Sequence, residues 1–494
     1  MDDLTVGGNA SGCVIGTPSG SGDEWSVALT GCGDGSVTLA LGAQRVEDLV
    51  ANVGPATPAT SSSVTVDRTA PTSSGSIAAV ATTDTSVSVG YTASDGSGVG
   101  VSSLQAFYST SASLTSPQGC GSVTSSAASG TIACTIPATD ATYRVYTRAT
   151  DALGTVEAAP GVADDTIVRD TVRPEATINP GKPASNTGGV TYTVTFTESV
   201  TGVAQDDLVL GGTAAGCAVQ GVSAGGSSAT VTVAGCGNGT VTLGLEADAA
   251  ADIAGNTGPA SQADAATVVM DTIKPTVGVP TVRPRTGVPL KGSSIPVTVA
   301  WAGGDNAGGA GIAGYTLQRS LDGGSTWTTL ATGLTTASRA TTVPSSGTTR
   351  FRVRATDKAG NTSSYATGGS RKGRLVQQSS SSVGYAGSWT LASSTKFSGG
   401  SVRYAKTGGR AAAYTFTGKS IAVVSTRSTT RGKVRIYLDG VLQATVDTYR
   451  SSAQYRSVIW QQSFSSAVTK RVRVVVVGTS ERPRFDLDAF AVIK

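Results

Sequence analysis

The sequence predicts an all-β protein that consists of several consecutive β-sandwiches. Short β-branched runs such as Val190–Phe196 alternate with turns rich in Gly, Ser, Asn and Asp, a pattern typical of antiparallel strands. At 494 residues the chain is too long for one hydrophobic core, so several domains are expected. No segment shows the apolar period of a convincing amphipathic helix.

An internal repeat sets the domain organisation. Residues 206–275 lie over residues 2–71 without a gap, and a register held for about 70 residues is a repeat. The first copy has no counterpart of residues 173–205. We therefore expect the first domain to be partial, and the chain to be a fragment of a longer exported protein.

Three junctions share one pattern, in which an Asp is followed four residues later by a Pro. They are Asp67 to Pro71, Asp170 to Pro174 and Asp271 to Pro275. Proline ends the hydrogen bonding of a strand and stiffens a short linker. The spacings of 103 and 101 residues suit a β-sandwich domain. The expected modules are 1–66 (partial), 67–169, 170–270, 271–370 and, beyond a Gly- and Ser-rich linker at 368–382, 383–494.

Two kinds of module alternate in the first 370 residues. Module 170–270 ends in the turn Asp252-Ile-Ala-Gly-Asn256 and resembles the bacterial immunoglobulin-like repeats of exported surface proteins; residues 1–66 match only its later strands. Modules 67–169 and 271–370 share an Arg-Ala-Thr-Asp strand end and resemble fibronectin type III or related Ig-like modules. Tyr143 stands where that family places its corner tyrosine.

The last expected module, 383–494, has a different character. Its hairpin Tyr437-Leu-Asp439-Gly440 and its closing strand, Phe485-Asp-Leu-Asp-Ala-Phe490, resemble the galactose-binding-like, carbohydrate-binding-module-like jelly rolls of exported proteins. The resemblances together imply tandem immunoglobulin-like β-sandwiches followed by a β jelly-roll sandwich. They bear on the fold more than on any ligand.

The six cysteines form three local pairs in the sequence: Cys13 with Cys32, Cys120 with Cys134, and Cys217 with Cys236. None has the CxxC spacing of a zinc or redox site, and one pair recurs in register within the repeat. We expect three disulfides, although reduced buried cysteines also fit the pattern. Disulfides indicate an oxidising compartment, so we expect a secreted or cell-surface protein. The sequence shows no signal peptide and no membrane span.

The absence of histidine excludes Ser-His-Asp and Cys-His catalysis and His-ligated metals. No phosphate-binding or dinucleotide-binding Gly motif is present. Asp486 and Asp488 could form a carboxylate pair for glycoside hydrolysis, but we favour a structural role at the rim of the jelly roll. The sequence therefore predicts a protein that is not an enzyme and that has no organic cofactor.

Calcium is the inorganic partner that the sequence favours, because Asp and Asn oxygens at domain ends suit a hard cation. The candidate ligands are Asp252, Asn256 and Asp271. Equivalent positions are Asp48, Asn52 and Asp67 in the first copy, and Asp357 and Asn361 in module 271–370. Such residues also form turns through their own side-chain hydrogen bonds, and the sequence leaves both interpretations open.

Charge is distributed unevenly along the chain. Residues 371–494 contain 20 Lys and Arg against 5 Asp and Glu, whereas residues 1–370 contain 17 and 28. The asymmetry favours binding of the C-terminal module to a polysaccharide or an anionic polymer of the cell envelope. Nucleic acid is not expected, because no recognition motif accompanies the charge.

Aromatic and Arg side chains are the candidate ligand-binding residues of this module, because rings stack on sugars and Arg binds carboxylate and phosphate. The candidates are Tyr449, Arg450, Tyr455, Arg456, Arg431 and Trp389. The first four flank the turn at Ser451 and Ser452.

These observations predict a non-enzymatic, extracellular surface or adhesion protein fragment, in which Ig-like spacers present a C-terminal module that binds carbohydrate or the cell envelope. The alternative is an accessory binding region of a secreted polysaccharide-active enzyme, with the catalytic domain upstream of Met1.

Overall fold

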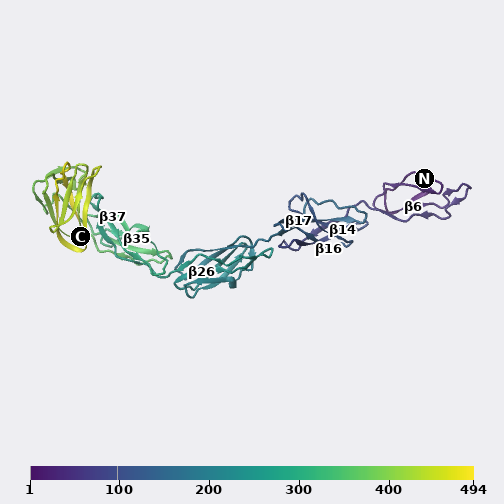
Figure 1. The fold of residues 1–494 in the computed structure, drawn as a ribbon, viewed down its shortest axis with the longest axis horizontal. Helices are drawn as coiled ribbons and strands as arrows, with labels where there is room; N and C mark the ends of the chain where they lie inside the picture. The colour runs from purple at the N-terminus through teal and green to yellow at the C-terminus, as the bar shows by residue number, and fades with distance from the viewer. Residues whose placement is uncertain (1, 97) are drawn as a thin grey trace.

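The computed structural model describes residues 2–96 and 98–494. Five β-rich modules follow one another in an elongated chain, with the termini in opposite end modules (Figure 1). No sheet among the described residues combines strands of two modules. Apart from the 3-10 turns η1 (Gln205–Asp207) and η2 (Ser398–Gly400), the regular elements there are strands. The predicted class, all-β with tandem immunoglobulin-like sandwiches, is confirmed.

Module 3, residues 170–270, is the complete copy of the repeat. Its strands are β19 (Ala176–Pro180), β20 (Ala184–Ser185), β21 (Val190–Phe196), β22 (Val200–Thr201), β23 (Leu208–Gly212), β24 (Ala218–Gly225), β25 (Ser228–Ala234), β26 (Gly239–Leu245), β27 (Ala250–Asp252), β28 (Thr257–Gly258), β29 (Ala263–Asp264) and β30 (Val268–Met270). Sheets β19-β21-β25-β24 and β20-β30-β26-β23 enclose one core. Strand β21 alternates buried and exposed residues, and its Tyr192 hydroxyl donates to the Val241 carbonyl over 3.3 Å.

Module 1 contains only part of this sandwich. Its strands are β1 (Leu4–Gly8), β2 (Val14–Ile15), β3 (Ser19–Ser21), β4 (Glu24–Ser26), β5 (Leu29–Thr30), β6 (Gly35–Leu41), β7 (Val46–Glu47), β8 (Val53–Gly54), β9 (Ala59–Thr60) and β10 (Val64–Val66). Strand β6 occupies the position of β26, but no described strand occupies that of β21. A hollow of about 340 Å³ therefore opens over Val37 and Leu39, whose equivalents in module 3 are fully buried.

Module 2, residues 67–169, is a two-sheet sandwich. Its strands are β11 (Thr72–Ser76), β12 (Ala81–Thr82), β13 (Ser86–Ser94), β14 (Val101–Ser109), β15 (Gln118–Thr124), β16 (Ser129–Thr135), β17 (Ala141–Asp151) and β18 (Asp165–Arg169). Sheet β11-β13-β16 packs on sheet β12-β18-β17-β14-β15. The buried Tyr143 donates its hydroxyl to the Thr139 carbonyl over 2.8 Å, which is the geometry of a corner tyrosine.

Module 4, residues 271–370, is built in a similar way. Its strands are β31 (Thr276–Val277), β32 (Thr281–Pro284), β33 (Ser294–Ala300), β34 (Gly303–Gly304), β35 (Ile312–Ser320), β36 (Thr328–Leu334), β37 (Ser338–Pro344), β38 (Arg350–Asp357) and β39 (Ala366–Thr367). Sheet β32-β33-β37 faces sheet β36-β35-β38-β39 across the core.

Module 5 is the C-terminal sandwich. Its strands are β40 (Gly373–Gln377), β41 (Val383–Ala386), β42 (Thr390–Ser393), β43 (Ser401–Ala405), β44 (Ala411–Arg427), β45 (Lys433–Leu438), β46 (Val441–Asp447), β47 (Gln454–Val476), β48 (Phe485–Leu487) and β49 (Ala489–Ile493). A seven-stranded sheet faces the three-stranded sheet β42-β43-β48. The expected start at residue 383 is wrong, because β40 pairs along its whole length with β49. The jelly-roll likeness stays a prediction.

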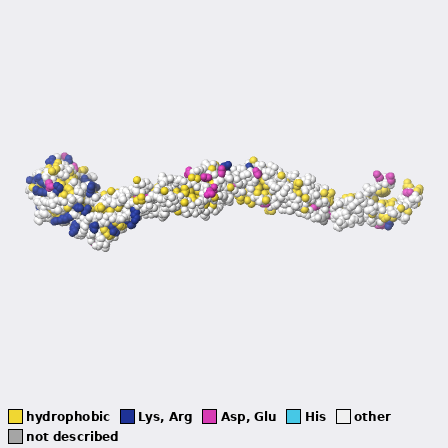
Figure 2. All heavy atoms as spheres, turned by 90° about the horizontal axis from the view of Figure 1, so that it is seen from below, with side chains coloured by type: hydrophobic (Ala, Val, Ile, Leu, Met, Phe, Trp, Pro, Cys, Tyr) yellow, Lys and Arg dark blue, Asp and Glu magenta, His cyan; other side chains and the backbone are white. Residues whose placement is uncertain are grey.

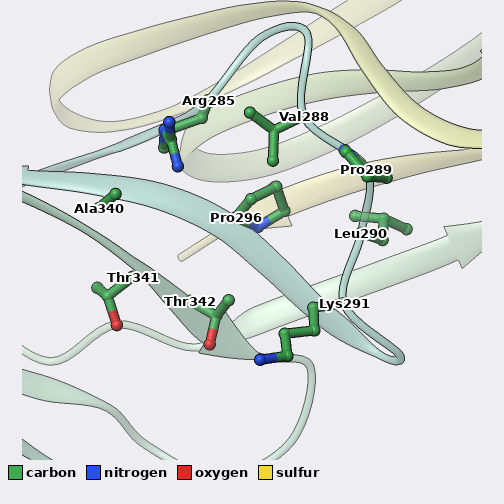
Figure 3. A pocket seen from close by; sticks show the side chains of 9 residues that line it. All are labelled: Arg285, Val288, Pro289, Leu290, Lys291, Pro296, Ala340, Thr341 and Thr342. Atoms are coloured by element: carbon green, nitrogen blue, oxygen red, sulfur yellow. The ribbon is translucent and has the colours of Figure 1, made fainter. Parts of the chain in front are cut away.

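Modules 4 and 5 are joined without a free linker. The loop between β32 and β33 pairs with the start of β47: Gly287 N donates to the Val458 carbonyl over 2.7 Å, and Leu290 N donates to the Arg456 carbonyl over 2.9 Å. Leu290 and Val458 belong to one apolar cluster with core residues of both modules. Figure 3 shows Val288, Pro289 and Leu290 on this loop, beside a shallow hollow of about 360 Å³.

Three disulfides link the cysteines in the predicted pairs, Cys13–Cys32, Cys120–Cys134 and Cys217–Cys236. Each lies within one module. The described residues contain no helix long and apolar enough to cross a membrane.

Candidate functional site

Carboxylates meet in threes at the first three module junctions. In each triplet, three oxygens, one from each residue, all lie within 4.8 Å of one another. The triplets are Asp67, Asp95 and Asp151; Asp170, Glu198 and Asp252; and Asp271, Asp305 and Asp357. The first member of each is the junction Asp, directly behind the last strand of the preceding module. The other two come from the following module. The triplets therefore join the linker to the entrance of the next sandwich.

At the first junction, backbone amides fix the orientation of all three carboxylates. Asp67 Oδ2 accepts from Val99 N over 2.8 Å, and Asp95 Oδ2 accepts from Gly100 N over 2.7 Å. Asp151, at the end of β17, is 1% exposed. Its Oδ1 accepts two backbone amides, while its Oδ2 and Asp95 Oδ1 are buried and have no hydrogen-bond partner among the described residues.

The third junction repeats this arrangement. Asp271 Oδ2 accepts from Ala310 N over 2.9 Å, and Asp305 Oδ2 accepts from Gly311 N over 2.7 Å. Asp305 Oδ1 is again buried, as is Oδ1 of the neighbouring Asn306, and neither has a hydrogen-bond partner in the part of the chain that the structure describes. Modules 2 and 4, which share the Arg-Ala-Thr-Asp strand end, thus hold the junction Asp and the loop Asp through equivalent backbone amides.

At the second junction Glu198 replaces the Asp of the loop. Burial raises the pKa of the Glu198 carboxyl, and the adjacent carboxylates of Asp170 and Asp252 raise it further. Asp252 accepts Asn256 N over 2.9 Å and the Asn256 amide over 2.7 Å. The same amide donates to the Asp170 carbonyl over 3.1 Å, so the Asp–Asn turn also holds the linker.

The residues predicted as metal ligands lie in two different carboxylate clusters. Asp252 and Asn256 lie at the entrance of module 3, whereas Asp271 lies beyond its exit and meets Asp357 instead. In the first copy, Asn52 donates to Asp48 over 2.9 Å as a simple turn, and no described acidic triplet includes them.

Sequence reasoning missed Asp95, Glu198 and Asp305. A signal was present, because an acidic residue stands 28 positions after both Asp67 and Asp170 and 34 positions after Asp271. The order of the strands in the sandwich brings each of these loop residues next to the Asp of a turn about 50 residues later in the sequence.

Two of the predicted ligand-binding residues of module 5 have structural partners. Arg431 is largely buried and donates from Nε to the fully buried Asp486 over 2.9 Å. Trp389 is half-buried against the core, with its ring 6.4 Å from that of Phe485. Both side chains serve the interior of the module rather than an open surface.

The other four predicted residues separate into two groups. Arg456 donates to the Thr395 and Lys396 carbonyls over 2.7 and 3.0 Å, and Tyr455 packs against Phe397. Tyr449 is exposed and lies under the Arg482 guanidinium at 4.8 Å, and Arg450 is exposed beside it. The two pairs thus contact different loops and do not converge on one pocket.

A basic face on module 5 was missed by the sequence reasoning. Lys433 and Arg435 on β45, and Arg471 and Arg473 on β47, are exposed, while the residues between them are buried. Arg473 lies directly opposite Tyr437, and Arg435 lies opposite Val475. None of these four basic side chains forms an ion pair or hydrogen bond with a described residue. The signal in the sequence was the alternation of basic and apolar residues in both strands.

No protein-family model and no curated protein matches the chain. Among solved structures, it is similar to invasin, a bacterial integrin-binding protein, with 12% identity and a TM-score of 0.33 over 96% of this chain and 92% of that one. Domains A168–A170 of titin match with 12% identity and a TM-score of 0.29, over 61% and 98%. The FN1–FN3 domains of chicken CNTN1 match with 15% identity and a TM-score of 0.24, over 61% and 98%. At these scores the likenesses do not bear on what this chain does.

Proposed function

We propose that this chain is a non-enzymatic, extracellular surface or adhesion protein, in which the sandwiches act as spacers and module 5 binds an anionic polymer. The ligand class is an acidic polysaccharide or an anionic polymer of the cell envelope. The observation that carries this proposal is the group of exposed side chains of Lys433, Arg435, Arg471 and Arg473, which we call the basic face. These side chains form no ion pair with a described residue.

The geometry of the basic face suits a repetitive anion. Arg471 and Arg473 are two positions apart on one strand, which places their Cα atoms about 6.5 Å apart on the same face. Arg435 is the diagonal neighbour of Arg473 on the adjacent strand. Arg binds planar carboxylate or phosphate groups with two parallel hydrogen bonds. A polymer can therefore engage several guanidinium groups at once, which raises its overall affinity above that of one contact.

The distribution of charge along the molecule also supports module 5 as the binding end of the rod. Lys and Arg side chains gather on the C-terminal module, at the left of Figure 2, whereas Asp and Glu predominate along the middle and at the far end. Residues 371–494 carry a net charge of +15 from 20 basic and 5 acidic residues. Such a field attracts polyanions and weakens with added salt.

The elongated arrangement and the cystines support an extracellular spacer. The modules lie end to end, so the chain separates module 5 from the opposite terminus (Figure 1). Three disulfides are formed, and disulfides persist in oxidising surroundings. The alternative, an accessory region of a polysaccharide-active enzyme, would use the same basic face.

The test measures retention of the full chain on immobilised polymers. The full chain is needed because modules 4 and 5 share an apolar cluster, so an isolated module 5 would expose core side chains. We expect binding to polygalacturonate, which carries carboxylates, or to a teichoic acid, which carries phosphates, but not to neutral dextran. Binding should weaken steeply between low and high salt.

Variants separate the basic face from the general charge. The triple variant Arg435→Gln, Arg471→Gln and Arg473→Gln should lose at least tenfold in affinity, which corresponds to about 1.4 kcal/mol. A control of equal charge changes three exposed arginines elsewhere, Arg68→Gln, Arg283→Gln and Arg339→Gln. Equal loss in both variants, preference for DNA over both polymers, or no retention at low salt would contradict the proposal.

A further inference from the structure

We propose that each of the first three junctions binds one calcium ion through its carboxylate triplet, and that these ions fix each linker to the module that follows. The proposal concerns the stalk and is independent of the ligand of module 5. It rests on buried oxygens without partners among the described residues at the first and third junctions, and on uncompensated charge and a carboxylate triplet at the same place in all three.

Buried oxygens without a donor are the first observation. Asp151 is 1% exposed, and its Oδ2 has no hydrogen-bond partner within the first triplet. At the third junction, Asp305 Oδ1 and Asn306 Oδ1 likewise have no partner within residues 2–96 and 98–494. A buried polar atom without a partner destabilises the folded state by about 1–3 kcal/mol, and a charged one by more. A cation that binds these oxygens would remove this destabilisation, because it would coordinate the oxygens that accept no hydrogen bond.

Uncompensated charge is the second observation. No Lys or Arg among the described residues forms an ion pair with any of the nine carboxylates. Three carboxylates that lie so close together repel one another unless a proton or a cation intervenes. Five of the nine side chains are buried, namely Asp67, Asp151, Asp252, Asp271 and Asp357, so solvent screens the repulsion weakly.

The spacing fits calcium. Two oxygens that coordinate one Ca²⁺ at about 2.4 Å lie at most about 4.8 Å apart. In each triplet, one oxygen of each of the three carboxylates meets that limit. The donor set is entirely oxygen, which excludes the softer metals that prefer sulfur or imidazole. Mg²⁺ gives up its water reluctantly and demands a strict octahedron, whereas Ca²⁺ accepts irregular carboxylate sites of this kind.

Glycine keeps space beside the triplets. A side chain at Gly98 would collide with the carboxylates of both Asp67 and Asp95. A Cβ at Gly309 would lie 2.8 Å from both Asn306 Oδ1 and Asp271 Oδ2. The absence of a side chain at these two positions lets the loop approach the junction Asp while leaving room among the oxygens.

At the second and third junctions the preceding module also holds the linker by a hydrogen bond. Thr171 donates its hydroxyl to Asp140 of module 2 over 2.8 Å, and Thr272 donates its hydroxyl to Asn238 of module 3 over 3.0 Å. Each Thr directly follows the junction Asp. One residue is thus held by the preceding module and its neighbour by the following one, so an ion on the Asp would restrain the hinge between two sandwiches.

Calorimetric titration of the full chain with CaCl2, after treatment with EDTA, tests the stoichiometry. We expect three sites, with dissociation constants on the order of 10⁻⁴–10⁻³ M, as in other extracellular modules. The variants Asp95→Asn, Glu198→Gln and Asp305→Asn keep the shape of the side chain and each remove one charge from one triplet. Each should reduce the number of sites from three to two, and their combination should abolish binding.

The matched controls are Asp84→Asn and Glu246→Gln, exposed acids of modules 2 and 3 outside the triplets. Both should retain three sites. Calcium binding that survives in the combined variant would overturn the proposal, and so would a full chain that binds no calcium at millimolar concentration. Circular dichroism of each variant without calcium shows whether the sandwiches still fold, so loss of a site is distinguishable from loss of a module.

Small-angle X-ray scattering supplies a second readout that does not depend on the heat of calcium binding. With calcium, the full chain should show a narrower distribution of dimensions and a larger maximum dimension than in EDTA, because three hinges are restrained. The combined variant should show no such difference. An unchanged profile for the wild-type chain at saturating calcium would contradict the stiffening role.

Discussion

The side-chain amide of Asn361 donates over 2.7 Å to the backbone carbonyl of Asp271, across 90 residues of sequence. Asn256 makes the corresponding bond to Asp170 over 3.1 Å in module 3. The same amides also bind the Asp that opens each turn. One side chain therefore ties the turn at the end of a late strand to the linker at which its module begins.

Replacing this amide should loosen the linker. We expect Asn361→Ala to accelerate proteolytic cleavage near residues 271–275 and to destabilise module 4 by about 1–3 kcal/mol, because two partly buried hydrogen bonds are lost. Limited proteolysis with mapping of the cut sites measures the first effect. The control is Asn52→Ala, whose amide binds Asp48 in its own turn. Equal cleavage at the linker in wild type and Asn361→Ala would contradict the assigned role.

The disulfide of module 3 should stabilise that module measurably. Cys217 and Cys236 close a loop with a sequence separation of 19, for which the chain-entropy model gives about 3 kcal/mol. We expect the double variant Cys217→Ser and Cys236→Ser to lower the free energy of unfolding of module 3 by that amount in urea titrations. Mass spectrometry of the exported, non-reduced protein should find all three cystines. Free thiols at all six positions would refute both the pairing and the oxidising location.

The open core of module 1 should make it the most protease-sensitive part of the rod. Val14 and Trp25 are more than half exposed, whereas module 3 covers its core with β21. Limited proteolysis of the full chain should therefore cut within residues 2–66 before it cuts within 170–270. The comparison is internal, since the two segments are copies of one repeat. Equal resistance of the two copies would show that the half-sandwich is a complete fold of its own.

The stability of module 5 should fall as the pH rises from about 4 to 7. Asp488 is fully buried, and burial raises the pKa of its carboxyl from 3.8 to about 7. An acid whose pKa is higher in the folded state binds more protons there, so its stabilising contribution is complete below pH 3.8 and is lost as the pH approaches 7. The variant Asp488→Asn, which stays neutral, should flatten this slope in thermal melts.

The control for this slope is the exposed Asp439. A backbone amide of Arg471 and the Lys470 ammonium lower the pKa of its carboxyl. Its contribution is therefore lost only as the pH falls below the usual range of an Asp, so Asp439→Asn should leave the slope between pH 4 and 7 unchanged. An identical slope in the wild type and Asp488→Asn would show that Asp488 does not carry the effect.

The sequence by itself determined the local features of this protein. The period-two alternation of Val190–Phe196 decides that one face of β21 is buried, and this needs no tertiary information. The repeat at an offset of 204 predicted both the incomplete first module and the recurrence of one cystine pair. Such features follow from neighbours in the chain or from a comparison of the chain with itself.

Only the tertiary structure decided which side chains meet. Asp252 and Asp271 are close in sequence, yet they lie in different clusters, because a sandwich places the end of its last strand opposite the loops at which the module begins. Asp67, Asp95 and Asp151 meet because strand pairing brings residues about 30 and 80 positions apart to one end of a module. Likewise, the sequence does not show whether Arg431 faces solvent or Asp486, because the two residues are 55 positions apart and meet only in the folded module.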